Sequence, residues 1–355
     1  MTFLDKIKKI FEKKEGKLPI SNTKLLLTIT ISIFVVMYLL AMIIWGEGFL
    51  NPQQFFDIFN NNAYLIAISF GLTIVMITGG IDISVGGTVA LVTMVCVCYM
   101  EKYNGGILSA VLISLGIGLA IGIIQGFLVS YLDIQPFIVT LAGMFFTRGM
   151  TTIVSKIPKN VSSESFNALR EVYIDIPFVG HYARNGNFIN SYIEIGVVII
   201  LVIFIALWAM LKWTRFGRNL YAIGGNSESA MMLGINVKRT KFFAYVLCGF
   251  LAGVGGLCYL LHTGAGNANN ATQAEMQAIA SSIIGGTLLS GGVGSVVGTL
   301  FGVMSLKTIN NIVVTSGLRE PYWQSITTGL MLCFFILLQS VILAYRRKKL
   351  GNKAV

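Results

Sequence analysis

Long apolar runs alternate with short polar connections along almost the whole chain. The hydrocarbon core of a bilayer is about 30 Å thick and needs about 20 apolar residues per helical crossing, so the runs can be counted as membrane segments. The ten predicted segments are 23–45, 63–79, 86–100, 107–131, 136–154, 191–213, 242–262, 275–290, 293–314 and 322–345. The third and eighth are short and flanked by glycine. The pattern therefore predicts an all-α, polytopic transmembrane protein of about ten segments, with some broken or short helices.

Composition agrees with this pattern. Of the 355 residues, 55% are hydrophobic and only 12% are charged, which is too apolar for a domain with a water-exposed surface. All cysteines fall within predicted segments, where they act as small apolar residues. These cysteines are Cys96, Cys98, Cys248, Cys258 and Cys333. Neither a disulfide framework nor a cysteine metal site is predicted.

Positive charge orients the segments, because cytoplasmic loops retain Lys and Arg. Of the 26 Lys and Arg residues, eighteen lie at the N-terminal end, in 212–241 and after 345. Six lie in the connections on the opposite side. Both termini are therefore predicted to be cytoplasmic, and the net charge of +11 is a topology signal that requires no nucleic-acid partner.

The chain divides into one transmembrane domain, 23–345, between two basic ends. Residues 1–22 place apolar side chains opposite lysines at helical spacing, which is typical of a helix lying on membrane lipid. A solvated basic tail is the alternative there, and 346–355 forms a second basic tail. The loop 155–190 is predicted to lie outside the membrane, with room for a short helix.

The inside segment 212–241 carries a helix-sized stretch at 227–237. Asn226 or Ser227 is its expected N-cap, Glu228 lies near the positive end of the helix dipole, and Gly234 is its expected stop. This stretch is the inside element long enough to receive a force from a partner. A plain loop helix lying on the headgroups is the alternative.

The sequence TGGIDISVGG at 78–87 interrupts an apolar run with four glycines and an acid, and so predicts a broken helix. Broken backbone at membrane depth persists only where protein or a water-filled cavity satisfies its polar groups. Asp82 and Ser84 are expected to cap the helix that follows, whereas Asp82 as a substrate or proton ligand is the alternative. A similar sequence, GGTLLSGG at 285–292, matches GGIDISVG at 79–86 and indicates duplicated halves.

Further polar groups fall inside predicted segments. Gln125, Asn310 and Asn311 could line a translocation pathway and hydrogen-bond hydroxyl groups of a substrate, or could join helices. Arg148 is expected to extend towards the membrane surface. A series of glycines is expected to allow close helix packing. The series is Gly285, Gly286, Gly291, Gly292, Gly294, Gly298 and Gly302.

Several classes of chemistry are missing. The chain has no GxxxxGK[ST] phosphate loop and no HExxH motif, and its two histidines are His181 and His262. No catalytic residue and no metal site are therefore predicted, and the chain is not expected to be an enzyme. If ATP drives this protein, the motor is another protein that acts on the inside segment.

Four blocks in order resemble the permeases of ribose, galactoside and related monosaccharide ABC importers, and most of all a galactofuranose-type permease. The blocks are TGGIDISVGG at 78–87, PFIVTLAGMFFTRG at 136–149, RFGRNLYAIGGNSESAMMLGINVKRTK at 215–241 and IASSIIGGTLLSGGVGSVVGTLFGV at 279–303. The resemblance spans nearly the whole chain. It implies a multi-pass permease of the bacterial plasma (inner) membrane that works by alternating access.

The resemblance also implies partners: a cytoplasmic ABC ATPase with two nucleotide-binding domains that hold ATP and Mg, a second permease copy or a sister permease, and an extracytoplasmic sugar-binding protein. This chain itself would bind no cofactor. By position, the family's coupling segment places the ATPase contact at Gly225, Asn226, Glu228, Ser229, Ala230, Gly234 and Ile235. Ser229 departs from the alanine that often follows the glutamate in the family. The alternative function is an ion-coupled secondary sugar transporter that uses Asp82.

Overall fold

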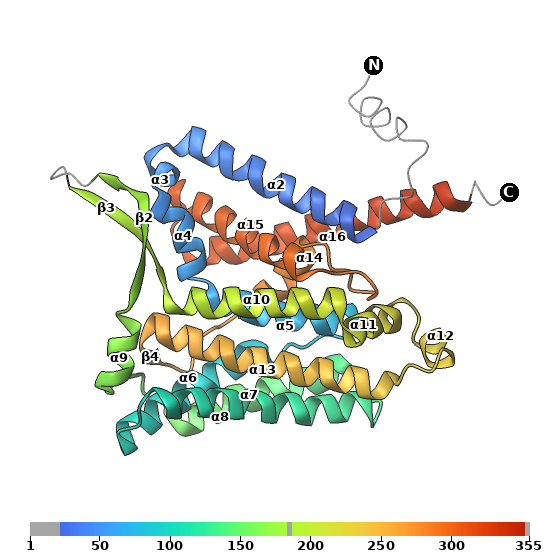
Figure 1. Cartoon of the computed structure of the whole chain (residues 1–355), viewed down its shortest axis with the longest axis horizontal. Coiled ribbons are helices and arrows are strands. Elements are labelled where there is room, and N and C mark those ends of the chain that lie inside the picture. Colours follow the sequence, from blue (N-terminus) through green and yellow to red (C-terminus); the bar gives the residue numbers. More distant parts are fainter. Residues whose placement is uncertain (1–21, 183–186, 352–355) are drawn as a thin grey trace.

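The computed structural model describes residues 22–182 and 187–351 (Figure 1). These residues form mainly helices, together with two small antiparallel pairs of strands. Among the described residues, eight helices are long and apolar enough to cross a membrane, or nine if one bent pair counts as a span. The all-α polytopic fold is therefore confirmed. The interfacial helix predicted within 1–22 and the last four residues of the 346–355 tail lie outside the described residues.

The fold combines helices of membrane-spanning length with a shorter, bent pair. The long helices are α2 (Asn22–Trp45), α6 (Val85–Tyr103), α7 (Ile107–Ser130), α8 (Pro136–Val154), α10 (Ile195–Trp213), α13 (Val237–Thr263), α15 (Val296–Thr315) and α16 (Pro321–Gly351). The bent pair is α4 (Pro52–Asn60) and α5 (Ala63–Ile77), which meet at 56°. The remaining helices are α3 (Glu47–Leu50), α9 (Glu164–Arg170), α11 (Arg215–Gly225), α12 (Ser227–Met232) and α14 (Ala274–Ile284).

Three predicted elements differ from the structure. The segment 275–290 is not one spanning helix, because α14 has 11 residues and is about 16 Å long at 1.5 Å per residue. The segment predicted at 191–213 becomes helical only at Ile195, since 188–194 belongs to a strand. The helix expected at 227–237 ends at Met232, and α13 begins separately at Val237.

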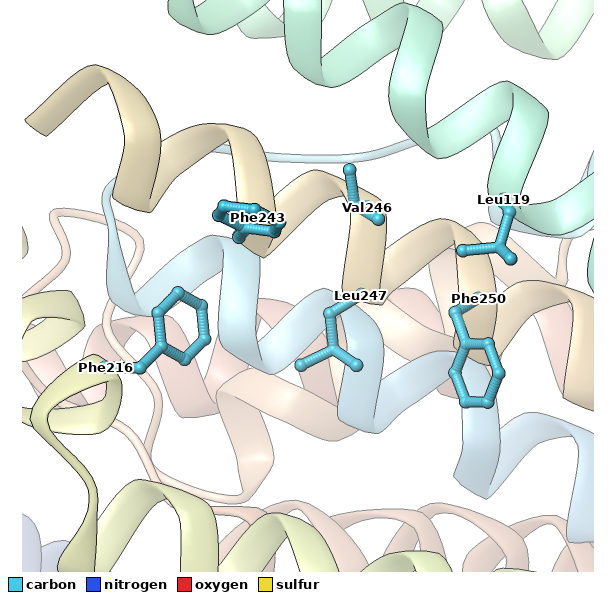
Figure 2. A pocket seen from close by; sticks show the side chains of 6 residues that line it. All are labelled: Leu119, Phe216, Phe243, Val246, Leu247 and Phe250. Carbon is cyan, nitrogen blue, oxygen red and sulfur yellow. The ribbon is translucent and has the colours of Figure 1, made fainter.

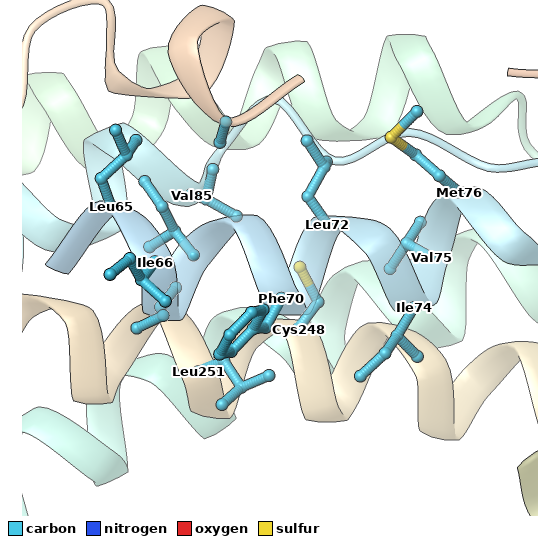
Figure 3. Close-up of a cluster of buried hydrophobic side chains, with 14 of the residues drawn as sticks. Leu65, Ile66, Phe70, Leu72, Ile74, Val75, Met76, Val85, Cys248 and Leu251 are labelled. Atoms are coloured by element: carbon cyan, nitrogen blue, oxygen red, sulfur yellow. The ribbon is translucent and has the colours of Figure 1, made fainter. Parts of the chain in front are cut away.

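Helix α5 forms the centre of the bundle. Every residue of α5 except Tyr64 is buried, as expected for a helix that is apolar on all sides. Figure 3 shows Phe70 of α5 beside Cys248 and Leu251 of α13, the long helix that packs along it. Since α5 meets protein on every face, the breaks at its end are surrounded by protein rather than lipid.

Glycines set the close crossing of α7 and α13. A Cβ added to Gly118 would lie 2.8 Å from Gly253 Cα, and one added to Gly122 would lie 2.8 Å from Tyr245 O. Small residues at such crossings let backbones approach and pack by dispersion, which is the main attraction between helices in lipid. The sequence pattern did not predict this crossing. The predicted packing role of the 285–302 glycines is confirmed where the backbone of Gly285 meets that of Gly298 in α15.

The two ends of the bundle differ (Figure 1). At one end, here the hairpin end, β2 (Tyr173–Tyr182) pairs antiparallel with β3 (Phe188–Glu194), with a register shift between Ile176 and Gly180. The strands β1 (Lys159–Asn160) and β4 (Ala265–Gly266) also pair antiparallel. Helices α11 and α12 lie at the opposite end, here the α12 end. The short helix expected in 155–190 is confirmed as α9, whereas the hairpin was not predicted.

Candidate functional site

The broken helix predicted at 78–87 is confirmed. Helix α5 ends at Ile77, and the N–H groups of Gly79 and Gly80 bond back to the carbonyls of Met76 and Val75. Gly79 has φ +83°, so these bonds form a Schellman motif with glycine in the left-handed conformation. The chain then runs without regular structure to Ser84, where α6 begins.

Helix α14 ends in the same way. The N–H groups of Gly286 and Thr287 bond to the carbonyls of Ile283 and Ser282, and Gly286 has φ +89°. The sequence echo therefore corresponds to two helices with the same stop. The structural register is one residue different from the sequence match, because Gly79 corresponds to Gly286 and not to Gly285.

Side chains from the first and last long helices donate to two carbonyls where α14 stops: Ile284 O, and Ile283 O, which also accepts from Gly286 N. Thr30 Oγ1 of α2 donates to Ile284 O at 2.7 Å, and Gln339 Nε2 of α16 donates to Ile283 O at 2.6 Å. Carbonyls at a helix end have no partner within the helix, and lipid offers none. The break is therefore compatible with membrane depth because the protein supplies the donors.

Asp82 lies in the first break and is only 1% exposed. Its Oδ1 accepts hydrogen bonds from Ser84 N at 2.9 Å and from Ser84 Oγ at 2.7 Å. The bond from Ser84 N satisfies the backbone N–H immediately before α6 in an Asx turn, whereas the Ser84 side chain, also expected as a cap, makes no capping hydrogen bond to α6. The carboxylate is thus bonded to its own turn, and the capping interpretation is favoured over a ligand role.

Gln125 of α7 joins the same group, since its Oε1 lies 3.2 Å from Ser84 Oγ. Ser84 has one hydroxyl hydrogen, and Asp82 already accepts it. Exchanging Oε1 and Nε2 of the amide would let Nε2 donate to Ser84 Oγ, and Nε2 as placed has no partner among the described residues. Asp82, Ser84 and Gln125 therefore form one hydrogen-bonded chain that fixes the start of α6 against α7.

Asn310 and Asn311 of α15 do not join that group by any hydrogen bond within the described part of the chain. Asn310 is buried, and neither polar atom of its amide has a partner among the described residues. Asn311 is exposed. One turn earlier, Lys307 Nζ donates to Gln277 Oε1 of α14 at 2.7 Å. Of the predicted pathway residues, the structure thus joins Asp82, Ser84 and Gln125 by hydrogen bonds, whereas no described hydrogen bond joins Asn310 or Asn311 to them.

Arg148 does not extend towards the membrane surface, and that prediction is wrong. Its guanidinium donates to Ala268 O at 3.3 Å, Asn270 O at 2.7 Å and Ala271 O at 2.8 Å. It also lies 3.8 Å from the carboxylate of Glu275 in α14. Arg148 therefore fixes the turn before α14 to α8. Sequence spacing gave no signal of this contact, since the partners are more than a hundred residues away.

One ion pair and further polar contacts hold the segments at the hairpin end. Glu101 accepts a hydrogen bond from Lys159 Nζ, and this bond raises the pKa of the lysine. His262 Nδ1 at the end of α13 lies 2.8 Å from a carboxylate oxygen of Glu194 in β3. Arg170 Nε donates to Leu261 O at 2.9 Å. The loop and hairpin are thus attached to α13 at several points.

The predicted N-cap and stop of α12 are confirmed. Asn226 Oδ1 accepts from Ser229 N at 2.7 Å, and Gly234 has φ +82°. Glu228 in the first turn is exposed. Of the other residues predicted to contact an ATPase, Gly225, Asn226, Ser229 and Gly234 are exposed, Ile235 is partly buried and Ala230 is buried.

The sequence prediction of the ATPase contact did not include three of the most exposed apolar side chains of 212–241. Met231, Met232 and Leu233 are 62%, 84% and 80% exposed. Three consecutive apolar residues in an otherwise polar connection were the available signal. Helix α11, which carries α12, was also not predicted. An apolar surface outside the long helices is typical of a protein contact.

A cavity of about 440 Å³ lies between α7, α11 and α13 (Figure 2). It is lined by Leu119, Phe216, Phe243, Val246, Leu247 and Phe250. A site for a sugar needs placed polar groups to bind its hydroxyls, and this lining has none. The cavity is therefore not the sugar site.

Comparison with known proteins identifies the family. A family model described as "Branched-chain amino acid transport system / permease component" matches residues 54–336. The chain belongs to this permease family. The permease is 37% identical to the inner membrane ABC transporter permease protein YjfF of Escherichia coli, with 88% of this chain and 91% of the relative covered.

Two further relatives carry sugar names. The permease is 31% identical to the fructose import permease protein FruG of Bifidobacterium longum, over 88% of this chain and 89% of the relative. It is also 31% identical to the galactose/methyl galactoside import permease protein MglC of Escherichia coli, over 89% of this chain and 94% of the relative. No solved structure matches. The family and the membrane-length helices identify a multi-pass permease of the inner membrane and do not support the ion-coupled alternative.

Proposed function

We propose that this permease is the membrane-spanning subunit of an ABC importer that carries a monosaccharide by alternating access, driven by a separate ATPase. The observation that carries the proposal is the capped helix α12 with its exposed Met231, Met232 and Leu233. These side chains lie at the α12 end of the bundle, where a water-soluble partner can cover them. Relatives named for fructose and galactose import support the sugar class, and a galactofuranose-type substrate is the narrower proposal.

The α12 end is proposed to face the cytoplasm. Lys and Arg lie within α11 and on both sides of α11 and α12, namely Lys212, Arg215, Arg218, Lys238, Arg239 and Lys241. Positive charge of this kind is retained on the cytoplasmic side. The hairpin end then faces outward, and its exposed Phe178 and Tyr182 are proposed to contact the sugar-binding protein.

The substrate path is proposed to form between two permeases, either two copies or sister subunits. The one apolar cavity described above does not suit a sugar, whereas Asn310 and Lys307 place polar groups on α15. ATP and Mg are proposed to bind only to the ATPase, and this chain to bind no cofactor. The division into a basic N-terminal segment, one transmembrane domain and a basic tail remains part of the proposal.

The test is uptake of labelled monosaccharides by proteoliposomes that contain the permease, its genomically neighbouring ATPase and the binding protein, with and without internal ATP. Uptake that needs internal ATP and the ATPase is expected. Uptake by the permease alone, without ATP, would overturn the proposal.

The ATPase contact is tested by co-purification of the variants Met232→Asp and Glu228→Lys. In both variants the amount of co-purified ATPase is expected to fall at least tenfold. Met232→Asp places a charge in an apolar contact, and Glu228→Lys reverses a charge. Glu164→Lys makes the same charge reversal on exposed α9 at the hairpin end and is expected to bind the ATPase normally. Normal ATPase binding by the first two variants would remove α12 as the contact.

A further inference from the structure

Both broken helices meet at one point near the α12 end. Gly292 N, in the turn after α14, donates to Ile77 O, the last residue of α5, at 2.9 Å. The turn itself is closed by hydrogen bonds from Leu288 N to Val293 O and from Gly291 N to Leu288 O. Two segments more than two hundred residues apart are therefore joined backbone to backbone at the places where their helices stop.

The end of α11 lies directly on this hydrogen bond. A Cβ added to Gly224 would lie under 3.0 Å from both Ile77 O and Gly292 N, a distance that real Cβ atoms do not adopt. Tyr221, one turn earlier, donates its hydroxyl to Gly294 O at 2.9 Å. At Gly224 the contact is thus backbone against backbone, and the Tyr221 side chain adds a hydrogen bond beside it.

We propose that Gly224 is the contact through which α12 moves both broken helices together. That an ATPase moves α12 rests on the proposed function, whereas the contact of Gly224 with the two breaks is independent of that function. Helix α11 is a continuous element of 11 residues, and only Asn226 separates it from α12. Gly224 lies three residues before Ser227, the first residue of α12, so a shift of α12 reaches Gly224 through a link of two residues.

The two breaks are the parts of the bundle able to respond. Residues 78–84 and 285–295 have no helical ladder to break, so their backbone angles change at lower cost than those of α5 or α13. Because Gly292 is bonded to Ile77, displacement of one break moves the other. Gly224 is therefore a positioning residue and does not touch substrate.

The first test uses the purified permease in lipid, without the ATPase. Cys98 and Cys333 are replaced by Ala, because the other three cysteines are buried, and Leu289→Cys places a nitroxide on the exposed tip of the turn. Gly224→Ala is expected to raise the mobility of this nitroxide, since the new methyl group displaces the turn. Gly225→Ala is the matched control, because a Cβ there has nothing within 4 Å. Equal nitroxide spectra for the two variants would overturn the proposal.

The second test uses the complete importer. Gly224→Ala is expected to keep the bound ATPase and ATP hydrolysis but to lose at least tenfold in uptake. Normal uptake would overturn the proposal. A wild-type permease that binds no ATPase would contradict the proposed function alone, since the nitroxide test would still report on the contact. If Gly224→Ala is not monodisperse, Tyr221→Phe replaces it and is expected to mobilise the turn by loss of the bond to Gly294, whereas an unchanged spectrum would count against the contact.

Discussion

The contacts of Arg148 with the turn before α14 and with Glu275 allow a quantitative prediction. Replacement of Arg148 by Leu removes the donor to Ala268 O and Asn270 O, for which no other donor is described, and leaves the carboxylate of Glu275 without its cation. Ala271 O keeps the hydrogen bond from Ala274 N. Glu275→Gln instead removes the negative charge and keeps a side chain of the same size. The two changes therefore separate the ion pair from the carbonyl contacts.

The cost can be worked from the geometry. Each carbonyl that loses a donor in a partly buried site costs about 1 kcal/mol. Opposite charges about 4 Å apart attract by about 1 kcal/mol in water and about 4 kcal/mol near a protein surface. The Arg148 and Glu275 side chains are 22% and 11% exposed, so the attraction is near the second figure and is partly offset by the cost of removing both charges from water. We expect Arg148→Leu to cost about 4 kcal/mol, of which about 2 kcal/mol is coupling to Glu275.

The assay is equilibrium unfolding in mixed micelles titrated with sodium dodecyl sulfate, applied to the wild type, the two single variants and the double variant. The double variant is expected to be about 2 kcal/mol more stable than the sum of the single losses predicts. A coupling energy below about 0.5 kcal/mol, which is within ordinary additivity, would refute the ion pair as a stabilising contact.

Further predictions follow from the glycine crossing, the first break and the hairpin. Gly122→Val is expected to lower the free energy of unfolding by about 2 kcal/mol or more, because the added atoms meet Tyr245 O. Gly116→Val is the control, and it should lower the free energy of unfolding by less than about 1 kcal/mol, because a Cβ there has nothing within 4 Å. Equal losses would show that the crossing is not tight. Asp82→Asn is expected to retain uptake within twofold, since an amide oxygen can also accept the capping bonds; collapse of uptake would show that the charge is needed. Phe178, 95% exposed with φ +67°, should be replaceable by Gly without loss of stability, whereas uptake that depends on the binding protein should fall. Unchanged uptake would exclude Phe178 from docking.

Local signals in the sequence were enough to predict the long helices and the caps, stops and breaks between them. An apolar run long enough to cross the bilayer is stable there as an α-helix, because a helix satisfies its own backbone polar groups where lipid offers no partner. Asn226 as a cap and Gly234 as a stop depend only on neighbouring residues, so their roles could be predicted without the rest of the chain. The same applies to the break at 78–87.

Elements that depend on distant partners were missed. Helix α11 mixes Arg and Gly with apolar residues in Arg215–Gly225, and its pattern resembles a loop until α5 and α13 cover its apolar side. The end of α14 is set by backbone geometry at Gly286 rather than by a change in hydrophobicity, so 275–290 was counted as a span. The partners of Arg148 lie in a turn that becomes its neighbour only when α8 packs near α14.

The closure of α14 has a consequence for biogenesis. Its freed carbonyls accept hydrogen bonds from Thr30, in the first described helix, and from Gln339, in the last. The ribosome makes these two residues more than three hundred positions apart, so α14 enters the membrane before its last donor exists. A chain truncated before α16 would lack the side-chain donor to Ile283 O, and Gly286 N would then remain as a backbone donor to that carbonyl. The hydrogen bonds around the end of α14 are therefore complete only after the last long helix has been made and packed.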